Sequence, residues 1–485
     1  MSRSRTLFSF RSFSTTAVLF TALGVLSTSH VARANGRYPL SQQLLVDPSD
    51  TKHLFLRSTY GVLTSSDGGA SWFWMCESGI GYDPGEDPMM AILGDGSVLV
   101  GASEGLFATH DRGCTWPKDA TIGDTYVRDL ATESGGTAAL ATTVTVEQGG
   151  RYDAAVWRSA DGAVTWKNLG TLSTGSVLPF TLDVAPSDAE RVYVTTTVQS
   201  ATRDAGVSDG PGILFVSKDG GVTWKEKPIP GTTRNNGPYI AAVHPTDPDV
   251  LYVRVRGEWD GTNPVQSWLL YSEDAGDTWK ELFRANADML GFALAPDTTT
   301  VLVGMGDTRD VLRPVDDSVL GLYRASGPAF TFSRLGTGEV GCLVYSGAAL
   351  YVCGGEETDG YELGVSNDDG ETVTPVFEYG MVRGPLACPP STPQAMICAS
   401  QWSTACRGLG DCPRVDAGTS SGAAGSATSS GCCGSATPRS SAPQIGTSQL
   451  TMLPGEGGAW AAGTAAVFGI LRRLRRRRRK SQNRS

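Results

Sequence analysis

The sequence predicts an all-β protein: a seven-bladed β-propeller built from four-stranded antiparallel sheets. Three observations support this prediction. The composition is rich in turn residues, an eight-residue segment recurs along the chain, and each interval between copies repeats one succession of strand-like segments. The chain has 485 residues, including 60 Gly and 26 Pro, and only 19% are charged. Long amphipathic helices are hard to find in such a sequence.

The recurring segment has the form S-x-D-x-G-x-T-W, and its copies start 41 to 58 residues apart. The copies occupy residues 65–72, 109–116, 159–166, 217–224, 272–279 and 366–373, with a decayed copy at 325–332. Their carboxylates belong to Asp67, Asp111, Asp161, Asp219, Asp274 and Asp368. An Asp at this position can accept hydrogen bonds from the turn's own N–H groups and from its Ser and Thr residues. We therefore expect these six residues to be structural.

Two copies depart from the pattern. Ala163 stands where the other turns have a Gly for a positive φ, so we expect the third turn to be strained or altered. Gly327 stands where the sixth turn should have its Asp, so that turn must be held by another contact.

Each unit reads as four strands with two apolar faces, and a ring of such blades buries both faces. Two strand-like segments follow the seventh unit, at residues 385–390 and 395–400. They could form a half-blade or pair with the first blade, so eight blades, or seven and a half, are the alternatives.

These copies resemble the Asp-box (BNR repeat) of sialidases, sortilin-type receptors, xyloglucanases and photosystem II stability factors. The opening segment, residues 35–72, is similar to that of myxobacterial Asp-box proteins. A sialidase would need an arginine triad, a Tyr nucleophile with a Glu base, and an Asp acid. Arg37 loosely matches the motif that opens sialidase propellers, but no Tyr/Glu pair can be placed. Whether the chain is an enzyme stays open, and the sequence favours a protein without catalysis.

Charge and hydropathy divide the chain into four parts. Residues 1–34 have a basic start, an apolar stretch and an Ala-x-Ala ending, which is typical of a signal peptide. The propeller is expected at 35–402, and a linker that holds cysteines and then Ser and Gly at 403–431. The net charge is −10, and removing the 4 and 9 positive charges of the two ends leaves −23 for the middle. So acidic a body does not suit nucleic acid.

The last part, residues 432–485, contains Cys432 and Cys433, a short apolar run and an Arg cluster. This order resembles the MYXO-CTERM sorting signal of myxobacteria. The resemblance implies that Cys432 or Cys433 is the site of processing and anchoring. It also implies that the exported protein is held at the bacterial cell surface or outer membrane, where sorting machinery and the membrane are its partners.

Ten cysteines in an exported chain are more often paired in disulfides than bound to metal. Sequence spacing suggests four bridges. They are Cys76–Cys114, Cys342–Cys353, Cys388–Cys398 and Cys406–Cys412.

The connections after the second strand of each blade are long and rise from the rim opposite the Asp-boxes, which we call the top rim. Loops of variable length on a rigid ring are where binding residues are expected. The candidates are Arg151, Asp153, Arg203, Asp204, Asp209, Glu258, Trp259, Asp260, Asp307, Arg309, Asp310, Asp316, Asp317, Glu356, Glu357 and Asp359. The same loops also contain Glu147, Tyr152, Arg256, Arg313, Tyr361 and Glu362.

These acidic loops predict a surface-anchored, non-catalytic recognition or scaffold propeller that binds an extracellular glycan or protein. The alternative is a glycoside hydrolase, which needs two carboxylates across a cleft. No metal site is defined and no cofactor is expected, although the carboxylates could bind Ca²⁺.

Overall fold

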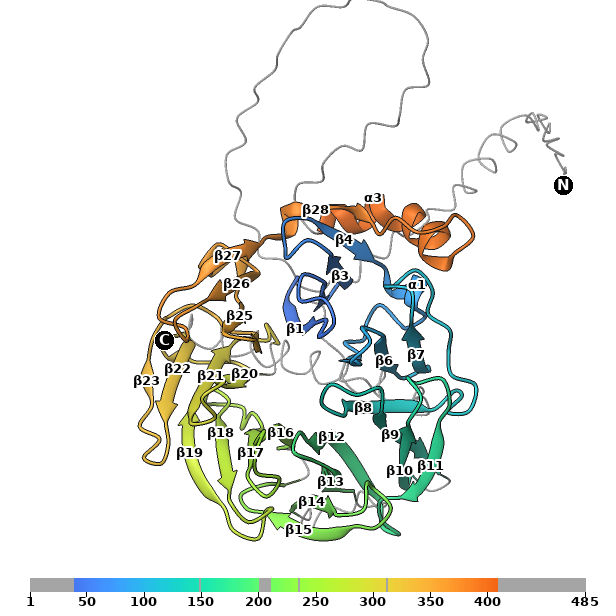
Figure 1. Cartoon of the computed structure of the whole chain (residues 1–485). Coiled ribbons are helices and arrows are strands. Elements are labelled where there is room, and N and C mark those ends of the chain that lie inside the picture. The colour runs from blue at the N-terminus through green and yellow to red at the C-terminus, as the bar shows by residue number, and fades with distance from the viewer. Residues whose placement is uncertain (1–38, 148–149, 200–210, 234–235, 311–312, 409–485) are drawn as a thin grey trace, which may run out of the picture. The chain divides into compact units, whose positions relative to one another are not determined.

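The computed structural model describes residues 39–147, 150–199, 211–233, 236–310 and 313–408. The expected signal peptide and sorting tail, including Cys432 and Cys433, lie outside these residues. Seven sheets follow one another around a ring (Figure 1). The predicted seven-bladed propeller of antiparallel sheets is confirmed.

In each blade the chain runs from the innermost strand outward. The first strands are β1 (Ser41–Val46), β5 (Met89–Ile92), β8 (Tyr126–Thr132), β12 (Val177–Ala185), β16 (Pro238–Val243), β20 (Asp288–Leu294) and β24 (Cys342–Ser346). The second strands are β2 (Leu54–Ser58), β6 (Val98–Ala102), β9 (Ala139–Val146), β13 (Asp188–Val198), β17 (Leu251–Arg256), β21 (Thr300–Gly306) and β25 (Ala349–Cys353). The third strands are β3 (Gly61–Ser65), β7 (Gly105–Thr109), β10 (Tyr152–Ser159), β14 (Gly212–Ser217), β18 (Ser267–Ser272), β22 (Gly321–Ser326) and β26 (Leu363–Ser366). The fourth strands are β4 (Trp72–Met75), β11 (Lys167–Thr171), β15 (Lys225–Ile229), β19 (Lys280–Ala285), β23 (Ser333–Arg334) and β27 (Thr374–Phe377).

The blades hold together because each sheet is apolar on both faces. In β13, Val194 packs into the core shared with blade three, whereas its neighbour Tyr193 packs into the core shared with blade five. Successive side chains of a strand point to opposite faces, so one apolar strand can serve two interfaces. The ring buries what a single blade would expose.

The Asp-box turns have the structure that the sequence predicts. In the fifth box, Asp274 accepts hydrogen bonds from the Ser272 hydroxyl and from the N–H and hydroxyl of Thr278. The Ser272 oxygen in turn accepts a bond from the Gly276 N–H at 2.7 Å. The other complete boxes repeat this network, so the Asp carboxylate fixes the turn between the third and fourth strands.

The third turn is strained but not altered. Ala163 adopts a φ of 63° and donates its N–H to Ser159 as the glycines of the other boxes do. A side chain in this left-handed region costs about 1 kcal/mol. The sixth turn is held differently, as expected: the Phe330 N–H bonds to Ser326 O. Its Gly327 N–H bonds to Thr299 O, as the N–H of Ala275 bonds to Asp249 O in the fifth box.

Blade two departs from the four-stranded pattern. Its sheet contains β5, β6 and β7, and a single bridge between Phe107 and Lys118 stands in place of a fourth strand. Pro117 precedes Lys118 and has no N–H to donate, which interrupts the ladder at this point.

After blade seven the chain crosses to blade one. Residues Tyr379–Met381 form a 3₁₀ turn (η2), and β28 (Val382–Pro385) then pairs in parallel with β4, the outer strand of blade one. The chain ends its described course in a π-helix, η3 (Gln394–Cys398), and α3 (Ala399–Gly408). The ring is therefore closed by β28, which shares only Pro385 with the first predicted segment, and residues 386–390 are not in a strand. The expectation of a strand at residues 395–400 was wrong, because this segment is helical.

Two predicted disulfides are corrected. Cys76 bonds to Cys398 and Cys114 bonds to Cys388, instead of Cys76–Cys114 and Cys388–Cys398. The prediction assumed a hairpin between residues 388 and 398. The segment from β28 to α3 instead lies along the outer edge of blades one and two (Figure 1), so Cys388, which precedes the helices, and Cys398, which lies in η3, meet different blades.

The Cys342–Cys353 bond joins directly opposed residues of β24 and β25, as the short hairpin predicts. Cys406 is also disulfide-bonded. Its predicted partner, Cys412, lies outside the described residues.

Candidate functional site

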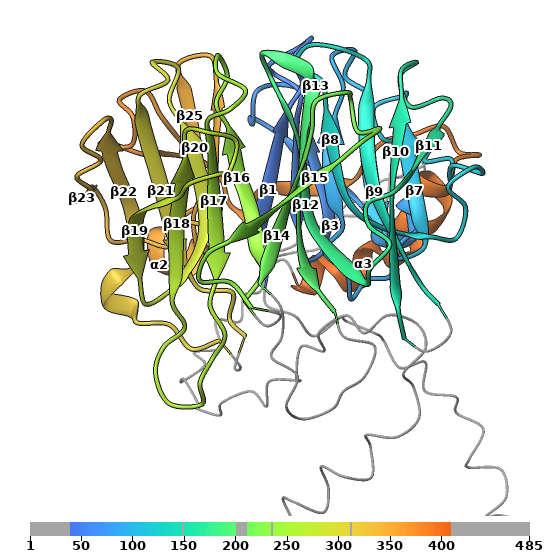
Figure 2. The same cartoon turned by 90° about the horizontal axis from the view of Figure 1, so that it is seen from below.

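The antiparallel order places the Asp-box turns at one rim and the connections after the second strands at the other. α2 (Glu356–Asp359) belongs to one of these connections and lies toward the lower rim in Figure 2, so that rim is the top rim of the sequence argument. The short helix α1 (Glu77–Ile80) lies in the connection from blade one to blade two, and η1 (Asp317–Val319) lies in the loop of blade six.

Many of the predicted loop residues bond within their own loops. Arg151 pairs with Glu147, and the carboxylate of Asp260 accepts the N–H groups of residues 262 and 263. Asp316 accepts the Ser318 N–H at the start of η1. Glu356 accepts the N–H of Tyr379, which helps to join blade seven to the closing segment. These contacts shape the loops.

One group of predicted residues comes together between blades six and seven. Arg309 pairs with Asp307 and with Glu339, and Asp359 accepts the Glu339 N–H at 3.0 Å. Burial raises the pKa of Glu339 to about 7, with Asp307, Asp317 and Asp359 adding to the effect and Arg309 opposing it.

The other predicted residues do not form a cluster with this group. Asp153 lies on β10, Glu258 is exposed, and the indole N–H of Trp259 is buried without a partner. Asp310 and Glu357 lie in the loops of blades six and seven. Arg203, Asp204 and Asp209 lie outside the described residues. Among the described residues, no group of three or more His, Cys, Asp or Glu side chains is arranged to hold a metal ion.

A second feature of the ring lies on the inner strands. Five of them contain a bulge that leaves one residue out of the pairing with the second strand. The residues left out are Gln42, Arg128, Phe180, Ala241 and Leu290. A bulge changes the direction of its side chain, and bulges are common beside binding sites.

Two of these residues belong to a line of cations and rings that crosses three blades. We call Tyr126, Arg128, Phe180, Tyr239 and Arg254 the arginine–aromatic row. The Arg128 guanidinium lies 5.1 Å from the Tyr126 ring and 5.9 Å from the Phe180 ring. Phe180 meets Tyr239 edge-on at 5.1 Å, and Arg254 lies 5.2 Å from the Tyr239 ring. All five side chains are half-buried.

The two arginines of the row bond to neutral groups. Arg128 donates to Pro179 O and to the Tyr126 hydroxyl, and Arg254 donates to Met289 O and Leu290 O. No described carboxylate lies within ion-pair distance of either guanidinium. Burial lowers the pKa of Arg254 to about 10, and the neighbouring charge of Arg256 adds to this effect.

Beside the row, Asp288 is fully buried between two further arginines. Arg256 Nε lies 3.2 Å from one Asp288 oxygen, and Arg313 donates to the same carboxylate at 2.6 Å. Burial opposes ionisation of Asp288, but Arg256 and Arg313 together hold its pKa at about 2. The described part of the row and of this cluster therefore has four guanidinium groups and one contacting carboxylate.

Other buried acids are used to join segments of the ring. Burial raises the pKa of Glu362 to about 7, and this side chain accepts the N–H groups of Ser41 and Glu356 across the seam between blades one and seven. Glu86 likewise accepts the N–H and hydroxyl of Ser103, and burial raises its pKa to about 7.

Sequence reasoning identified Arg256 and Arg313 as loop residues but missed the row. Arg128 and Arg254 lie inside strands, where a charged residue is easily taken for a solvent-facing position in the alternation of apolar and polar residues. The available signal was a positive charge in an inner or second strand that is otherwise apolar, as in YVRDLAT and LYVRVR.

No helix among the described residues has the length and apolarity needed to cross a bilayer.

Comparison with known proteins gives a family match over part of the chain. The model of the Sortilin-Vps10 family (sortilin, neurotensin receptor 3) matches residues 154–310, which run from blade three into blade six. No curated protein matches significantly. Similar solved structures include YCF48 bound to a D1 peptide, with 13% identity over 59% of this chain and 80% of that one and a TM-score of 0.38.

Two hydrolases are also similar. The GH74 xyloglucanase from Xanthomonas campestris has 14% identity over 73% of this chain and 66% of that chain, with a TM-score of 0.33. The α-L-arabinofuranosidase Arb93A from Fusarium graminearum has 14% identity over 55% of this chain and 87% of that chain, with a TM-score of 0.37. Identity at this level concerns the fold and not the activity. The chain is a seven-bladed β-propeller similar in kind to those of sortilin and BNR-repeat proteins.

Proposed function

We propose that the chain is a non-catalytic recognition propeller that binds an anionic segment of a glycan or protein at the arginine–aromatic row. The observation that carries this proposal is that Arg128 and Arg254 are half-buried and lack a carboxylate partner among the described residues. A guanidinium that has lost part of its hydration gains most from a ligand carboxylate or sulfate.

The aromatic members of the row supply the second part of the recognition. The rings of Phe180 and Tyr239 offer apolar faces beside the two cations, which suits a sugar ring or a peptide side chain that carries an acid. The body of the chain is strongly acidic. A cationic centre in an acidic surround gives selectivity, because anions off the centre are repelled.

A glycoside hydrolase is the second candidate, and the carboxylates favour it less. The described acids with a pKa raised to about 7 are Glu86, Asp129, Asp183, Glu339 and Glu362. Each is bonded to backbone N–H groups or to arginine. Tyr271 does bond to Glu273, but this pair lies toward the Asp-box rim, and no described arginine pairs with Glu273. A sialidase would need these groups together.

Export and surface anchoring belong to the same proposal. They are supported by the signal-like residues 1–34 and by the order of Cys432-Cys433, apolar run and Arg cluster. A tethered receptor or scaffold is the role that this arrangement fits.

Binding of the full chain to carboxylated, sulfated and neutral oligosaccharides and to tetraglutamate peptide would test the proposal. We expect saturable binding of acidic probes only, with a loss of at least tenfold in Arg128→Gln and in Arg254→Gln. Phe180→Ala removes a ring without removing a charge and should weaken binding less.

Arg383→Gln is the matched control, because Arg383 is exposed on β28 and its substitution removes the same positive charge. Equal losses in Arg383→Gln and the row variants would reduce the effect to general electrostatics and overturn the proposal. Turnover of fluorogenic glycosides that is abolished by substituting a top-rim acid would establish the hydrolase instead.

A further inference from the structure

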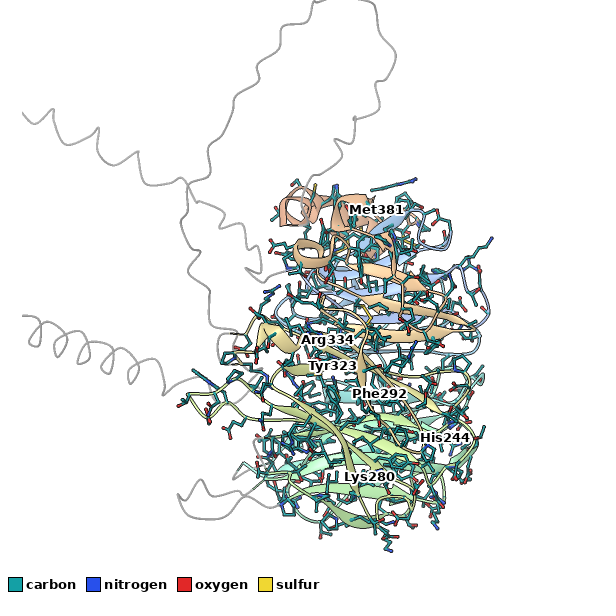
Figure 3. All side chains as sticks on the ribbon, turned by 90° about the vertical axis from the view of Figure 1, so that its left-hand side faces the viewer. His244, Lys280, Phe292, Tyr323, Arg334 and Met381 are labelled. Carbon is teal, nitrogen blue, oxygen red and sulfur yellow. A yellow bond between two sulfur atoms is a disulfide. The ribbon has the colours of Figure 1, made fainter. Side chains whose placement is uncertain are left out.

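The junction between blades five and six contains a cavity of about 530 Å³ at the Asp-box rim. We call it the 5/6 groove. Its aromatic lining is Tyr252, Tyr271, Trp279 and Phe330, and its polar lining includes His244, Asp247, Glu273 and Lys280. His244 lies near this rim in Figure 3, whereas Arg334 lies toward the other.

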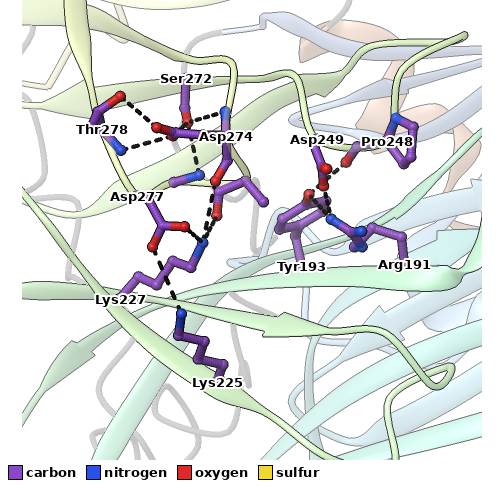
Figure 4. A network of polar contacts seen from close by, with 12 residues as sticks. Arg191, Tyr193, Lys225, Lys227, Pro248, Asp249, Ser272, Asp274, Asp277 and Thr278 are labelled. Carbon is purple, nitrogen blue, oxygen red and sulfur yellow. Dashed lines mark hydrogen bonds and ion pairs between the residues drawn. The ribbon is translucent and has the colours of Figure 1, made fainter.

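The corresponding place between blades four and five is filled by two cations (Figure 4). Lys227 of blade four donates to the carbonyls of Asp274 and Ala275 in the fifth Asp-box and pairs with Asp277 at 2.9 Å. Arg191 of blade four pairs with Asp249 in the next blade. Both cationic side chains are only 8% exposed.

Two other junctions are filled in a similar way. Arg324 of blade six donates to Asp369 O and pairs with Glu371 in the seventh box. In blade three, Arg158 packs so closely against the fourth box that a Cβ on Gly220 would lie 2.3 Å from its guanidinium. Arg158 and Arg324 both occupy the position just before the first residue of their own box.

At the 5/6 groove these cations are absent. Strand pairing aligns Leu251 with Val192, so Val250 takes the place of Arg191. By the same pairing, Phe283 takes the place of Lys227, because it lies opposite Leu269 as Lys227 lies opposite Leu214. Tyr271 takes the place of Arg158 and Arg324, just before the first residue of the box.

The box that faces the groove has changed as well. In the sixth box, Gly327 replaces the Asp, and Phe330 stands where the fifth box has Asp277. Phe330 lies 5.3 Å from the Tyr271 ring. The carbonyl positions that accept Lys227 in the fifth box correspond to Gly327 and Pro328, and no described side chain donates to them. The junction between blades five and six therefore has neither the counterparts of Lys227 and Arg191 nor an acid at the position of Asp277, and a cavity occupies this space.

The remaining polar groups of the groove are mostly acidic or neutral. The Tyr271 hydroxyl donates to Glu273 at 2.9 Å, and Asp247 lies in the turn beside it. His244 Nδ1 accepts the N–H groups of Thr246 and Asp247, and its Nε2 lies 3.1 Å from Thr298 O, which fits a neutral ring. Lys280 already lies over the Phe330 ring, 5.9 Å from its centre.

We propose that the 5/6 groove binds a lysine or arginine side chain of a partner polypeptide, in the position that the chain's own cations occupy at the neighbouring junctions. The incoming cation would meet the Gly327 and Pro328 carbonyls and the carboxylates of Asp247 and Glu273. Its alkyl stem would pack on Tyr271 and Phe330, where a cation over an aromatic face is attracted by the ring. None of the residues that line the groove belongs to the arginine–aromatic row, for which we propose the opposite charge preference.

Fluorescence anisotropy of labelled tetralysine with the full chain tests the site. Tyr271→Arg restores the residue type found at Arg158 and Arg324, so it should fill the groove and weaken binding at least tenfold. Asp247→Asn should weaken binding several-fold. Its matched control is Asp188→Asn, which makes the same change in the equivalent turn of blade four and should bind as the wild type does.

Tetralysine binding that is equal in the wild type, Tyr271→Arg and Asp247→Asn would place the peptide elsewhere and overturn the inference. A neutral oligosaccharide that binds in a Tyr271-dependent way, while tetralysine does not, would overturn it also. If Tyr271→Arg fails to fold by circular dichroism, the comparison of Asp247→Asn with Asp188→Asn decides. Arg128→Gln should not change tetralysine binding, so failure here and failure of the proposed function are distinguishable.

Discussion

The junctions on the two sides of blade five share one backbone frame and differ in how they are filled. Between blades four and five, Lys227 and Arg191 cross the interface and bond to the next Asp-box and turn. Between blades five and six the equivalent residues are apolar, and a cavity takes their place. The difference shows that a repeat can keep its fold while a few side chains turn one interface into a surface for a ligand.

The contrast also separates the two roles of the Asp-box. A complete box fixes its own turn and presents carbonyls to the preceding blade. The sixth box does neither through an Asp, and its turn is held by backbone bonds instead. The ring tolerates this loss because the core of β20, β21 and their neighbours remains buried.

The largest expected effect on stability comes from removing the ammonium group of Lys227 from the junction between blades four and five. Lys227→Met keeps the stem but removes the ammonium group, which leaves two carbonyls and Asp277 without their donor. We expect a loss of about 2 to 3 kcal/mol in the free energy of unfolding, measured by urea titration. Leu282→Met is a volume-conserving change in the outer strand of blade five, beside the junction that has no such cation, and should cost less than about 1.5 kcal/mol. Equal losses would mean that the contacts of Lys227 do not stabilise the fold.

A smaller effect is expected from the box itself. Asp274→Ala removes the acceptor for three hydrogen bonds in an exposed turn, and we expect a loss of about 1 to 2 kcal/mol by the same titration. Glu258→Ala, which removes an exposed acid of the top rim, should change stability by less than about 0.5 kcal/mol. A neutral Asp274→Ala would show that the box does not fix the turn.

The smallest expected effect is on the loss of stability at low pH. Hydrogen bonds from Thr278 hold the pKa of Asp274 at about 2, below its usual 3.8. Stability from this group is therefore complete above pH 4 and is lost as the pH falls toward 2. Asp274→Asn should flatten the acid limb of the stability curve slightly. An unchanged limb in Asp274→Asn would contradict the assignment.

The fold was predictable because the Asp-box is local. Its bonds join residues two to four positions apart, so eight letters contain the whole turn. The sequence also showed that the sixth box lacks its Asp, but it did not predict the cavity beside that box. The cavity is lined by Val250 and Tyr271, whose meaning becomes clear only when blade five is compared with its neighbours in space.

Long-range contacts were not predictable. Cys76 and Cys398 are 322 residues apart, and spacing alone paired each with a nearer cysteine. The arginine–aromatic row arises from bulges on separate inner strands, and a bulge has no single-residue signature when it contains Arg128 in one blade and Phe180 in the next. The candidate site could therefore be recognised only in the folded ring, whereas the ring itself could be predicted from the sequence repeats.

The two disulfides that join residues 388 and 398 to the first two blades have a mechanical consequence. The sequence continues beyond Gly408, and any pull on that end reaches the ring through Cys398 and Cys388, which are covalently bonded to Cys76 and Cys114. The short parallel pairing of β28 with β4 is thereby spared from load. A force applied at the C-terminal end would therefore enter the ring at covalently bonded points on two blades and would not separate the blades one after another.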